Sequence, residues 1–236
     1  MAIYDTYASR GRVKAGVALK ERQNQKIFAL GLLHSPRPAR ILEIGPGDGY
    51  LAALATAAGL GYVAVEGSAA TADGLRARGF EVHCGYVPRL PASLSGKFTC
   101  CFLLHVIEHM PEPTKAARLI EEIRQALVPG GSLVVACPDY TRWGRDFYDA
   151  DYTHCYPMTR RRLSQLLVDH GFHVVHHTIY TGSLFGYAGL PVSWLARILY
   201  SRLADDLFGR FVPRDVLNRG LLAFLPNLLT VAKRPN

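Results

Sequence analysis

The residues with the clearest chemical meaning are three glycines at every second position, which follow a short apolar run. Gly45, Gly47 and Gly49 come after Glu43, and an alanine- and leucine-rich stretch begins at Tyr50. Glycines let the backbone turn sharply and let a ligand lie against bare main chain, and the free N–H groups of the next helix attract electronegative atoms. A dinucleotide fingerprint would require a glycine where Tyr50 stands. The pattern therefore predicts a different nucleoside-type cofactor at a strand–turn–helix junction.

A second acidic residue at a matching distance supports this prediction. Glu66 ends the apolar stretch GYVAVE, about 20 residues after the glycine turn, where an acid accepts hydrogen bonds from ribose hydroxyls. The residues that we expect to bind the cofactor are therefore Glu43, Gly45, Gly47, Gly49 and Glu66, together with His105 at the end of a later strand.

Histidines gather after the apolar run at residues 98–104. His105, Glu108 and His109 formally match the inverted zinc-protease pattern, but that pattern needs a continuous helix, and a proline stands two residues later. A protease site is therefore not expected. Neutral imidazoles act as general bases near pH 7, so the candidate catalytic residues are His109 and, further along the chain, His154.

Apolar runs alternate with helix-like segments through most of the chain. We expect strands at residues 41–44, 61–66, 80–85, 98–104, 132–137 and 172–179, and helices at 50–58, 69–78, 113–127 and 159–170. This alternation predicts an α/β fold with a doubly wound, mostly parallel sheet. Ligands bind such sheets at the carboxyl ends of the strands. One crevice should therefore collect Glu43, Glu66, Gly85, His105 and Pro138.

The two ends of the chain carry additional helical segments. Residues 1–38 are expected to form an N-terminal helical cap, with a helix near Val17–Leu33, ahead of a cofactor-binding domain at 39–236. Within that domain, 180–227 is expected to be a helical insertion before a last strand at 228–232. Ser193 could cap a helix there, with an apolar stripe at Leu195, Ile198, Leu199, Leu203 and Leu207. A lid, a dimer interface and a peripheral membrane contact through 184–224 are the alternatives.

Composition limits the class of protein without naming its partner. The chain has 236 residues, 49% of them hydrophobic, and a formal net charge of +8, which permits an anionic partner such as nucleic acid, an acidic substrate or a membrane surface. No secretory leader or membrane-spanning run is evident. The five cysteines lack C-x-x-C spacing, so we expect reduced thiols and a cytoplasmic location.

Several segments resemble motifs of class I S-adenosylmethionine-dependent methyltransferases. The resemblance is carried by EIGPGDG at 43–49, VIEHM at 106–110, LVPGG at 127–131, VACP at 135–138 and the segment at 154–172. It is closest to the branch with ubiquinone-biosynthesis-like and polysaccharide-cluster O-methyltransferases. It implies a seven-stranded sheet with an antiparallel last strand, S-adenosylmethionine as cofactor and methyl transfer by direct displacement. Gly85 and Tyr86 stand where many relatives carry an acid that contacts adenine.

Some relatives, including small-RNA 3′-end methyltransferases, bind a divalent ion close to this position. The resemblance carries their ligand set onto His105, Glu108, His109 and His154, and three imidazoles with one carboxylate would suit zinc, manganese, cobalt or iron. The alternative, which we favour, has no metal and uses His109 or His154 as the base.

The resulting expectation is methyl transfer to a hydroxyl of a small molecule, sugar or glycan. Two alternatives remain open. One is a metal-assisted RNA 2′-O-methyltransferase, which the net charge of +8 would suit. The other is a non-catalytic S-adenosylmethionine-binding or membrane-associated scaffold. The sequence carries no code for the acceptor or for the oligomeric state.

Overall fold

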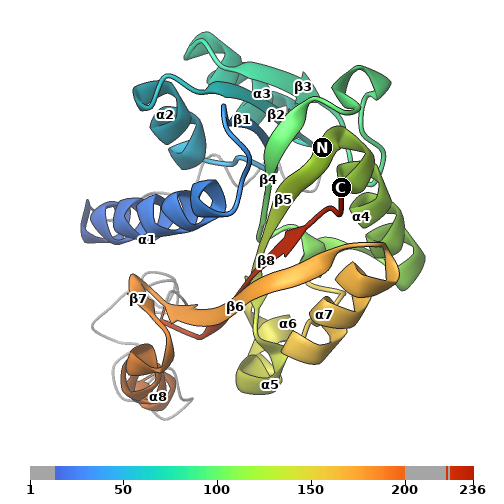
Figure 1. Cartoon of the computed structure of the whole chain (residues 1–236). Coiled ribbons are helices and arrows are strands. Elements are labelled where there is room, and N and C mark those ends of the chain that lie inside the picture. The colour runs from blue at the N-terminus through green and yellow to red at the C-terminus, as the bar shows by residue number, and fades with distance from the viewer. Residues whose placement is uncertain (1–13, 200–221, 223) are drawn as a thin grey trace.

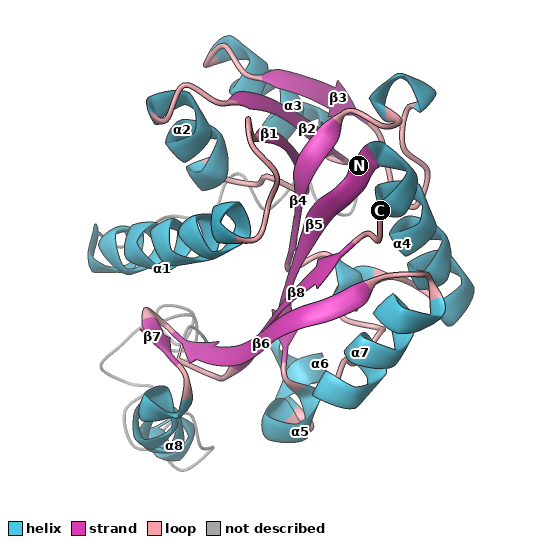
Figure 2. Ribbon diagram, viewed as in Figure 1, coloured by secondary structure: helices cyan, strands magenta, loops and turns pink. Residues whose placement is uncertain are grey.

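A single mixed β-sheet with helices on both faces forms the described part of the protein (Figures 1 and 2). The computed structural model describes residues 14–199, 222 and 224–236. The strands are β1 (Arg40–Ile44), β2 (Gly61–Glu66), β3 (Glu81–Cys84), β4 (Phe98–Leu104), β5 (Leu127–Pro138), β6 (His173–Thr181), β7 (Leu184–Phe185) and β8 (Asn227–Lys233). Their order in the sheet is β3-β2-β1-β4-β5-β8-β6-β7.

The first five strands run parallel, and β8 lies antiparallel between β5 and β6. Helices connect the parallel strands, as a parallel sheet requires. The α-helices are α1 (Lys14–Leu33), α2 (Tyr50–Ala57), α3 (Ala69–Ala77), α4 (Pro113–Ala126), α5 (Tyr140–Trp143), α6 (Asp146–Ala150), α7 (Arg160–Asp169) and α8 (Leu190–Leu199). Three short 3₁₀ helices are η1 (Ala92–Leu94), η2 (Ile107–His109) and η3 (Tyr187–Gly189).

The two faces of the sheet have separate cores because neighbouring strand residues point to opposite sides. On one face, Leu42 and Leu103 belong to a cluster with α4 and α7, whose buried stripes include Leu119 and Leu163. On the other face, a second cluster joins Ile41, Cys100 and Phe102 of the sheet with α1 and α2. Figure 1 shows α1 and α2 on one side of the strands and α4 and α7 on the other.

The sheet has eight strands, so the expected count of seven is wrong. The additional strand is β7, a two-residue edge strand in which Phe185 pairs with Tyr180 and Leu184 with Thr181. Gly182, with φ of 56°, makes the tight turn between the two strands. Because β6 extends to Thr181, the first residues of the expected 180–227 insertion belong to the sheet.

The helix expected in the insertion begins before Ser193, which therefore lies inside α8 rather than capping it. Pro191 stands near the start of α8, where proline fits a helix. Trp194 and Leu195 on α8 are 68% and 54% exposed, whereas Leu203 and Leu207 lie outside the described residues. The role of this segment as lid, dimer interface or membrane contact stays a prediction.

The chain before β1 and the start of β5 also differ from or extend the expectations. Strand β5 begins at Leu127, earlier than the expected strand at 132–137, so residues 128–131 belong to it. Helix α1 packs on the sheet: the ring of Phe28 stacks on Phe102 with centroids 5.9 Å apart. The first 13 residues of the expected N-terminal cap lie outside the described residues.

None of the described helices has both the length and the apolar character needed to cross a membrane.

Candidate functional site

The carboxyl ends of the parallel strands are tied to one another by main-chain hydrogen bonds. The amide of Gly45 donates to the carbonyl of Val65 at 2.9 Å, and the amide of His105 donates to Ala136 at 2.8 Å. After β3, the amide of Gly85 donates to the main-chain carbonyl of Glu66, the last residue of β2, at 2.9 Å. The structure therefore brings the ends of β1, β2, β3, β4 and β5 together at one edge, as the sequence predicts.

The glycine turn has the left-handed backbone that only glycine adopts easily. Gly45, Gly47 and Gly49 have φ values of 70°, 50° and 75°. A Cβ at Gly45 would stand 2.6 Å from a methyl group of Val106, and one at Gly49 would stand 2.6 Å from Leu75. A Cβ at Gly47 would meet no atom of the described residues within 4 Å. Within that part of the chain no side chain covers the main chain at Gly47, which fits a cofactor lying against the turn.

Glu43 is buried at the end of β1 and bonds to the hydroxyl of Tyr62 on β2, with 2.5 Å between the oxygens. Burial raises the pKa of Glu43 to about 7, although the hydrogen bond from Tyr62 opposes this shift and the charge of Glu66 adds to it. Glu66 accepts a hydrogen bond from the amide of Ser68 at 2.9 Å. Both acids thus have fixed orientations.

Tyr86 follows β3 and packs against the main chain after β2. A Cβ at Gly67 would stand only 3.0 Å from the ring of Tyr86, so glycine allows the ring to approach the end of β2. Tyr86 is 56% exposed.

His105 has a strained backbone, with the only positive φ among the described non-glycine residues, 55°. Its side chain joins two buried groups: Nδ1 lies 3.1 Å from Oε1 of Glu108, and Nε2 lies 2.7 Å from the hydroxyl of Tyr180. Both ring nitrogens are therefore engaged with neighbouring side chains. His105 remains a predicted cofactor-pocket residue.

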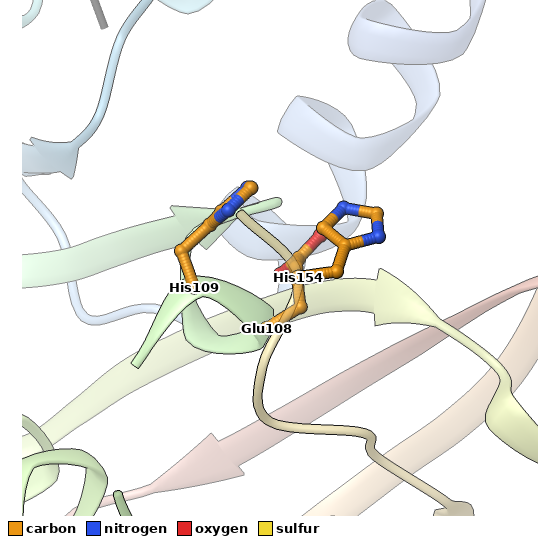
Figure 3. Close-up of side chains that lie close together, drawn as sticks. All are labelled: Glu108, His109 and His154. Carbon is orange, nitrogen blue, oxygen red and sulfur yellow. The ribbon is translucent and has the colours of Figure 1, made fainter. Parts of the chain in front are cut away.

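Glu108, His109 and His154 form a compact cluster (Figure 3). Each offers one ligand atom, and the three atoms lie within 4.8 Å of one another. Glu108 and His109 come from η2, whereas His154 comes from the segment before α7. The structure thus gathers three residues of the expected four-residue metal set, and His105 contacts the cluster through Glu108.

The electrostatics of this cluster favour a negative carboxylate at Glu108 beside a neutral imidazole at His109. Burial opposes the ionisation of Glu108, but the hydrogen bond and the charge of His105, together with His109, hold the pKa of Glu108 below its usual value. Burial lowers the pKa of His109. Oε2 of Glu108 is buried and has no hydrogen-bond partner among the residues that the structure describes. Such an atom costs free energy unless a ligand satisfies it.

Several partners of the site residues were not predicted. Tyr62 and Tyr180 hold Glu43 and His105, and Thr153 contacts His109. No local pattern marks them, because they lie 19, 75 and 44 residues away in sequence. Asp139, one of the acids near the site, instead caps α5 by accepting from the amide of Thr141 at 3.1 Å.

Solved structures of several methyltransferases have the same architecture, although their sequences differ strongly from this one. The chain is similar to an S-adenosylmethionine-dependent methyltransferase from Archaeoglobus fulgidus, with 16% identity, a TM-score of 0.61 and 97% of each chain covered. It is also similar to a methyltransferase of that type from Mesorhizobium loti, with 16% identity, a TM-score of 0.63, and 92% of this chain and 100% of that chain covered.

A third similar structure contains both ligands of a methyl transfer. It is the 1,6-didemethyltoxoflavin-N1-methyltransferase of Burkholderia thailandensis, with bound 1,6-didemethyltoxoflavin and S-adenosylhomocysteine. It has 17% identity and a TM-score of 0.62, and 98% of this chain and 84% of that chain are covered. No curated protein matches the sequence.

A family model described as a methyltransferase domain matches residues 19–177. This range is more than half of the chain and contains the glycine turn, η2 and His154. The protein therefore belongs to the methyltransferase-domain family: it is an enzyme whose cofactor is S-adenosylmethionine.

Proposed function

We propose that the enzyme transfers the methyl group to a hydroxyl oxygen of a small molecule or glycan. The observation that carries this proposal is the pair of imidazoles at His109 and His154, whose ring centroids are 5.0 Å apart. His109 follows the end of β4 in η2, whereas His154 lies in the segment before α7. A hydroxyl must lose its proton during methylation, and imidazoles near neutral pH are suited to accept it.

In this mechanism the chain positions the reactants and accepts one proton. When bound, S-adenosylmethionine would supply a methyl group on a positively charged sulfur. The acceptor oxygen would attack the methyl carbon in line, and the sulfur would leave. The carbon–sulfur bond breaks as the carbon–oxygen bond forms, and His109 or His154 takes the hydroxyl proton. The glycine turn, Glu43 and Glu66 hold the cofactor, and His105 lines its pocket. Most of the rate enhancement would come from orientation.

The test incubates the full chain with S-adenosylmethionine and a panel of acceptors that carry hydroxyl, amine or thiol groups. Mass spectrometry then locates the added methyl group. We expect transfer to oxygen, and His109→Gln or His154→Gln should lower kcat with little change in cofactor affinity. His170→Gln is the matched control, because His170 contacts the carbonyl of Leu166 within α7. Transfer to nitrogen or sulfur alone would overturn the proposal.

A second candidate is metal-assisted methylation, and the buried Oε2 of Glu108 specifically favours it. A divalent cation would satisfy this atom, and Glu108, His109 and His154 offer three donor atoms within 4.8 Å. One carboxylate and two imidazoles suit zinc, manganese, cobalt or iron better than magnesium. A cation there would lower the pKa of an acceptor hydroxyl, and the imidazoles would serve as ligands rather than bases.

Calorimetric titration of the full chain with Zn²⁺ and Mn²⁺ separates the two candidates. Saturable binding that Glu108→Gln and His154→Gln abolish, and that His170→Gln keeps, would favour the metal. Absence of binding would leave the imidazole base. An RNA acceptor would further show salt-sensitive binding of oligonucleotides, because phosphate contacts release counterions, whereas binding of cofactor without turnover on any acceptor would favour a scaffold.

A further inference from the structure

The hydroxyl of Thr153 lies between an imidazole of the site and a carboxylate. Its Oγ1 is 2.8 Å from Nδ1 of His109 and 2.7 Å from Oδ1 of Asp151. The same carboxyl oxygen accepts from the amide of Thr153 at 2.9 Å. Thr153 is thus held by Asp151 at two points while it contacts the ring of His109.

The direction of these hydrogen bonds fixes where the imidazole carries its proton. The hydroxyl of Thr153 donates its single hydrogen to Oδ1 of Asp151, the same oxygen that accepts from the amide. Oγ1 must then accept from His109, which places the proton of the neutral imidazole on Nδ1. The lone pair of the ring therefore lies on Nε2.

His154 has the same tautomer for an independent reason. Its Nδ1 lies 2.6 Å from the carbonyl oxygen of Phe147, which can only accept. The ring also stacks on that of Phe147, with centroids 4.6 Å apart. Both imidazoles of the site consequently carry their lone pairs on Nε2.

The segment that bears Thr153 is also attached to η2 by its main chain. The amides of Cys155 and Tyr156 both donate to the carbonyl of Glu108, at 3.0 and 2.9 Å. His109 is the next residue after Glu108, so the segment and the ring that it orients cannot move independently. The contact between Thr153 and His109 is therefore part of a fixed connection between two loops.

We propose that Asp151 and Thr153 are positioning residues that hold His109 in the tautomer with its lone pair on Nε2. This inference rests on the proposed function, in which that lone pair accepts the hydroxyl proton or binds a cation. A neutral imidazole without such a partner places its proton on either nitrogen, and the molecules protonated on Nε2 are inactive. The Asp151–Thr153 pair removes that loss by holding the proton on Nδ1.

The direct test measures the tautomer by nitrogen NMR on the full chain labelled with ¹⁵N-histidine, in alkaline buffer where the imidazoles are neutral. Loss of one signal pair in His109→Gln assigns the resonances. In the wild type, we expect the proton of His109 on Nδ1. Thr153→Val, which keeps the shape but removes the hydroxyl, should shift a substantial fraction to Nε2, and Thr153→Ser should restore the wild-type pattern.

Thr141→Val is the matched control, because the hydroxyl of Thr141 donates to Asp139 at 2.6 Å in the same way but contacts no imidazole in the described structure. It should leave the His109 signals unchanged. If Thr153→Val and the wild type show the same tautomer, the proposal is overturned. This reading needs no acceptor, so it is independent of whether the methyl group goes to oxygen.

Kinetics give the second reading. With an acceptor in hand, Thr153→Val should lower kcat about tenfold or more, as loss of a partner that orients a functional histidine does. KM for S-adenosylmethionine should change little, and Thr153→Ser should recover most of kcat. Equal loss in the Val and Ser variants would show that the hydroxyl is not what matters and would overturn the proposal.

Discussion

Oε2 of Glu43 lies 2.5 Å from the hydroxyl oxygen of Tyr62 on the neighbouring strand, beneath the glycine turn. The carboxyl group is 3% exposed, and its pKa of about 7 is well above the ordinary value of 4.5. The folded protein therefore keeps a proton that the unfolded chain loses. This buried acid thus makes stability depend on pH.

The first prediction concerns this dependence. Between pH 4.5 and 7 the folded state binds more protons than the unfolded state, so the free energy of unfolding falls as pH rises. Because the pKa of Glu43 rises from 4.5 to about 7, the free energy of unfolding should fall by ~3 kcal/mol across this range. Urea denaturation across this range should show the loss in the wild type and not in Glu43→Gln. Glu21→Gln, at an exposed position of α1, is the control and should follow the wild type. Parallel curves of unfolding free energy against pH for all three proteins would contradict the prediction.

The second prediction uses two glycines with the same backbone and different surroundings. Gly47 and Gly59 have φ values of 50° and 65°, and a Cβ on either would have no neighbour within 4 Å in the part of the chain that the structure describes. Gly47 lies before α2, at the strand ends, whereas Gly59 lies after α2. Either change to alanine should cost ~1 kcal/mol in stability. Only Gly47→Ala should weaken S-adenosylmethionine binding, by about tenfold or more, in calorimetric titration.

Equal affinities for Gly47→Ala and Gly59→Ala would contradict the placement of the cofactor against the turn. A loss of affinity in both variants would instead indicate that strain in α2 alone is responsible.

The third prediction concerns the strained backbone of His105. His105→Gly and His105→Ala both remove the contacts with Glu108 and Tyr180, but only glycine adopts a φ of 55° without strain. The glycine variant should therefore be more stable than the alanine variant by ~1 kcal/mol in urea denaturation. At His170, where φ is −103°, glycine should offer no such advantage. If His105→Ala is as stable as His105→Gly, the loop must relax to another backbone conformation.

The fourth prediction tests the packing of α1 on the sheet. A Cβ at Gly31 would stand 2.6 Å from the ring of Phe102, whereas one at Gly16 would meet nothing within 4 Å. Gly31→Ala should thus lower stability by ~1–3 kcal/mol through overpacking. Gly16→Ala in the same helix should raise it by up to ~1 kcal/mol, because alanine is the better helix former. Thermal and urea unfolding would measure both, and a stable Gly31→Ala would show that α1 is free to shift.

Much of the sheet could be predicted because its strands are buried on both faces. Phe98–Leu104 is a continuous apolar run, and β4 has the same bounds. Strand β7 could not be predicted, because two residues cannot show a periodic pattern. The start of β5 at Leu127 could not be predicted either, because Gly130 and Gly131 lie at an irregularity between Leu127, which pairs with Phe98, and Ser132, which pairs with Cys100.

The candidate site was predictable where its residues adjoin strand ends and not where tertiary contacts decide. The placement of Glu43, Glu66 and His105 at one edge follows from the alternation of strands and helices. The meeting of His109 with Thr153, and of His105 with Tyr180, depends on how distant loops pack. Their roles in binding and catalysis stay predictions.

The position of β8 has a consequence for how the protein is made. Strand β8 is the last of the chain in sequence but lies between β5 and β6, and it bonds to both. During synthesis, β6 and β7 cannot join the sheet until residues 227–233 have left the ribosome. In the described sheet, β8 is the strand that pairs with both β5 and β6. The half that carries the glycine turn can pair its strands earlier, so the two halves of the site should be completed at different times.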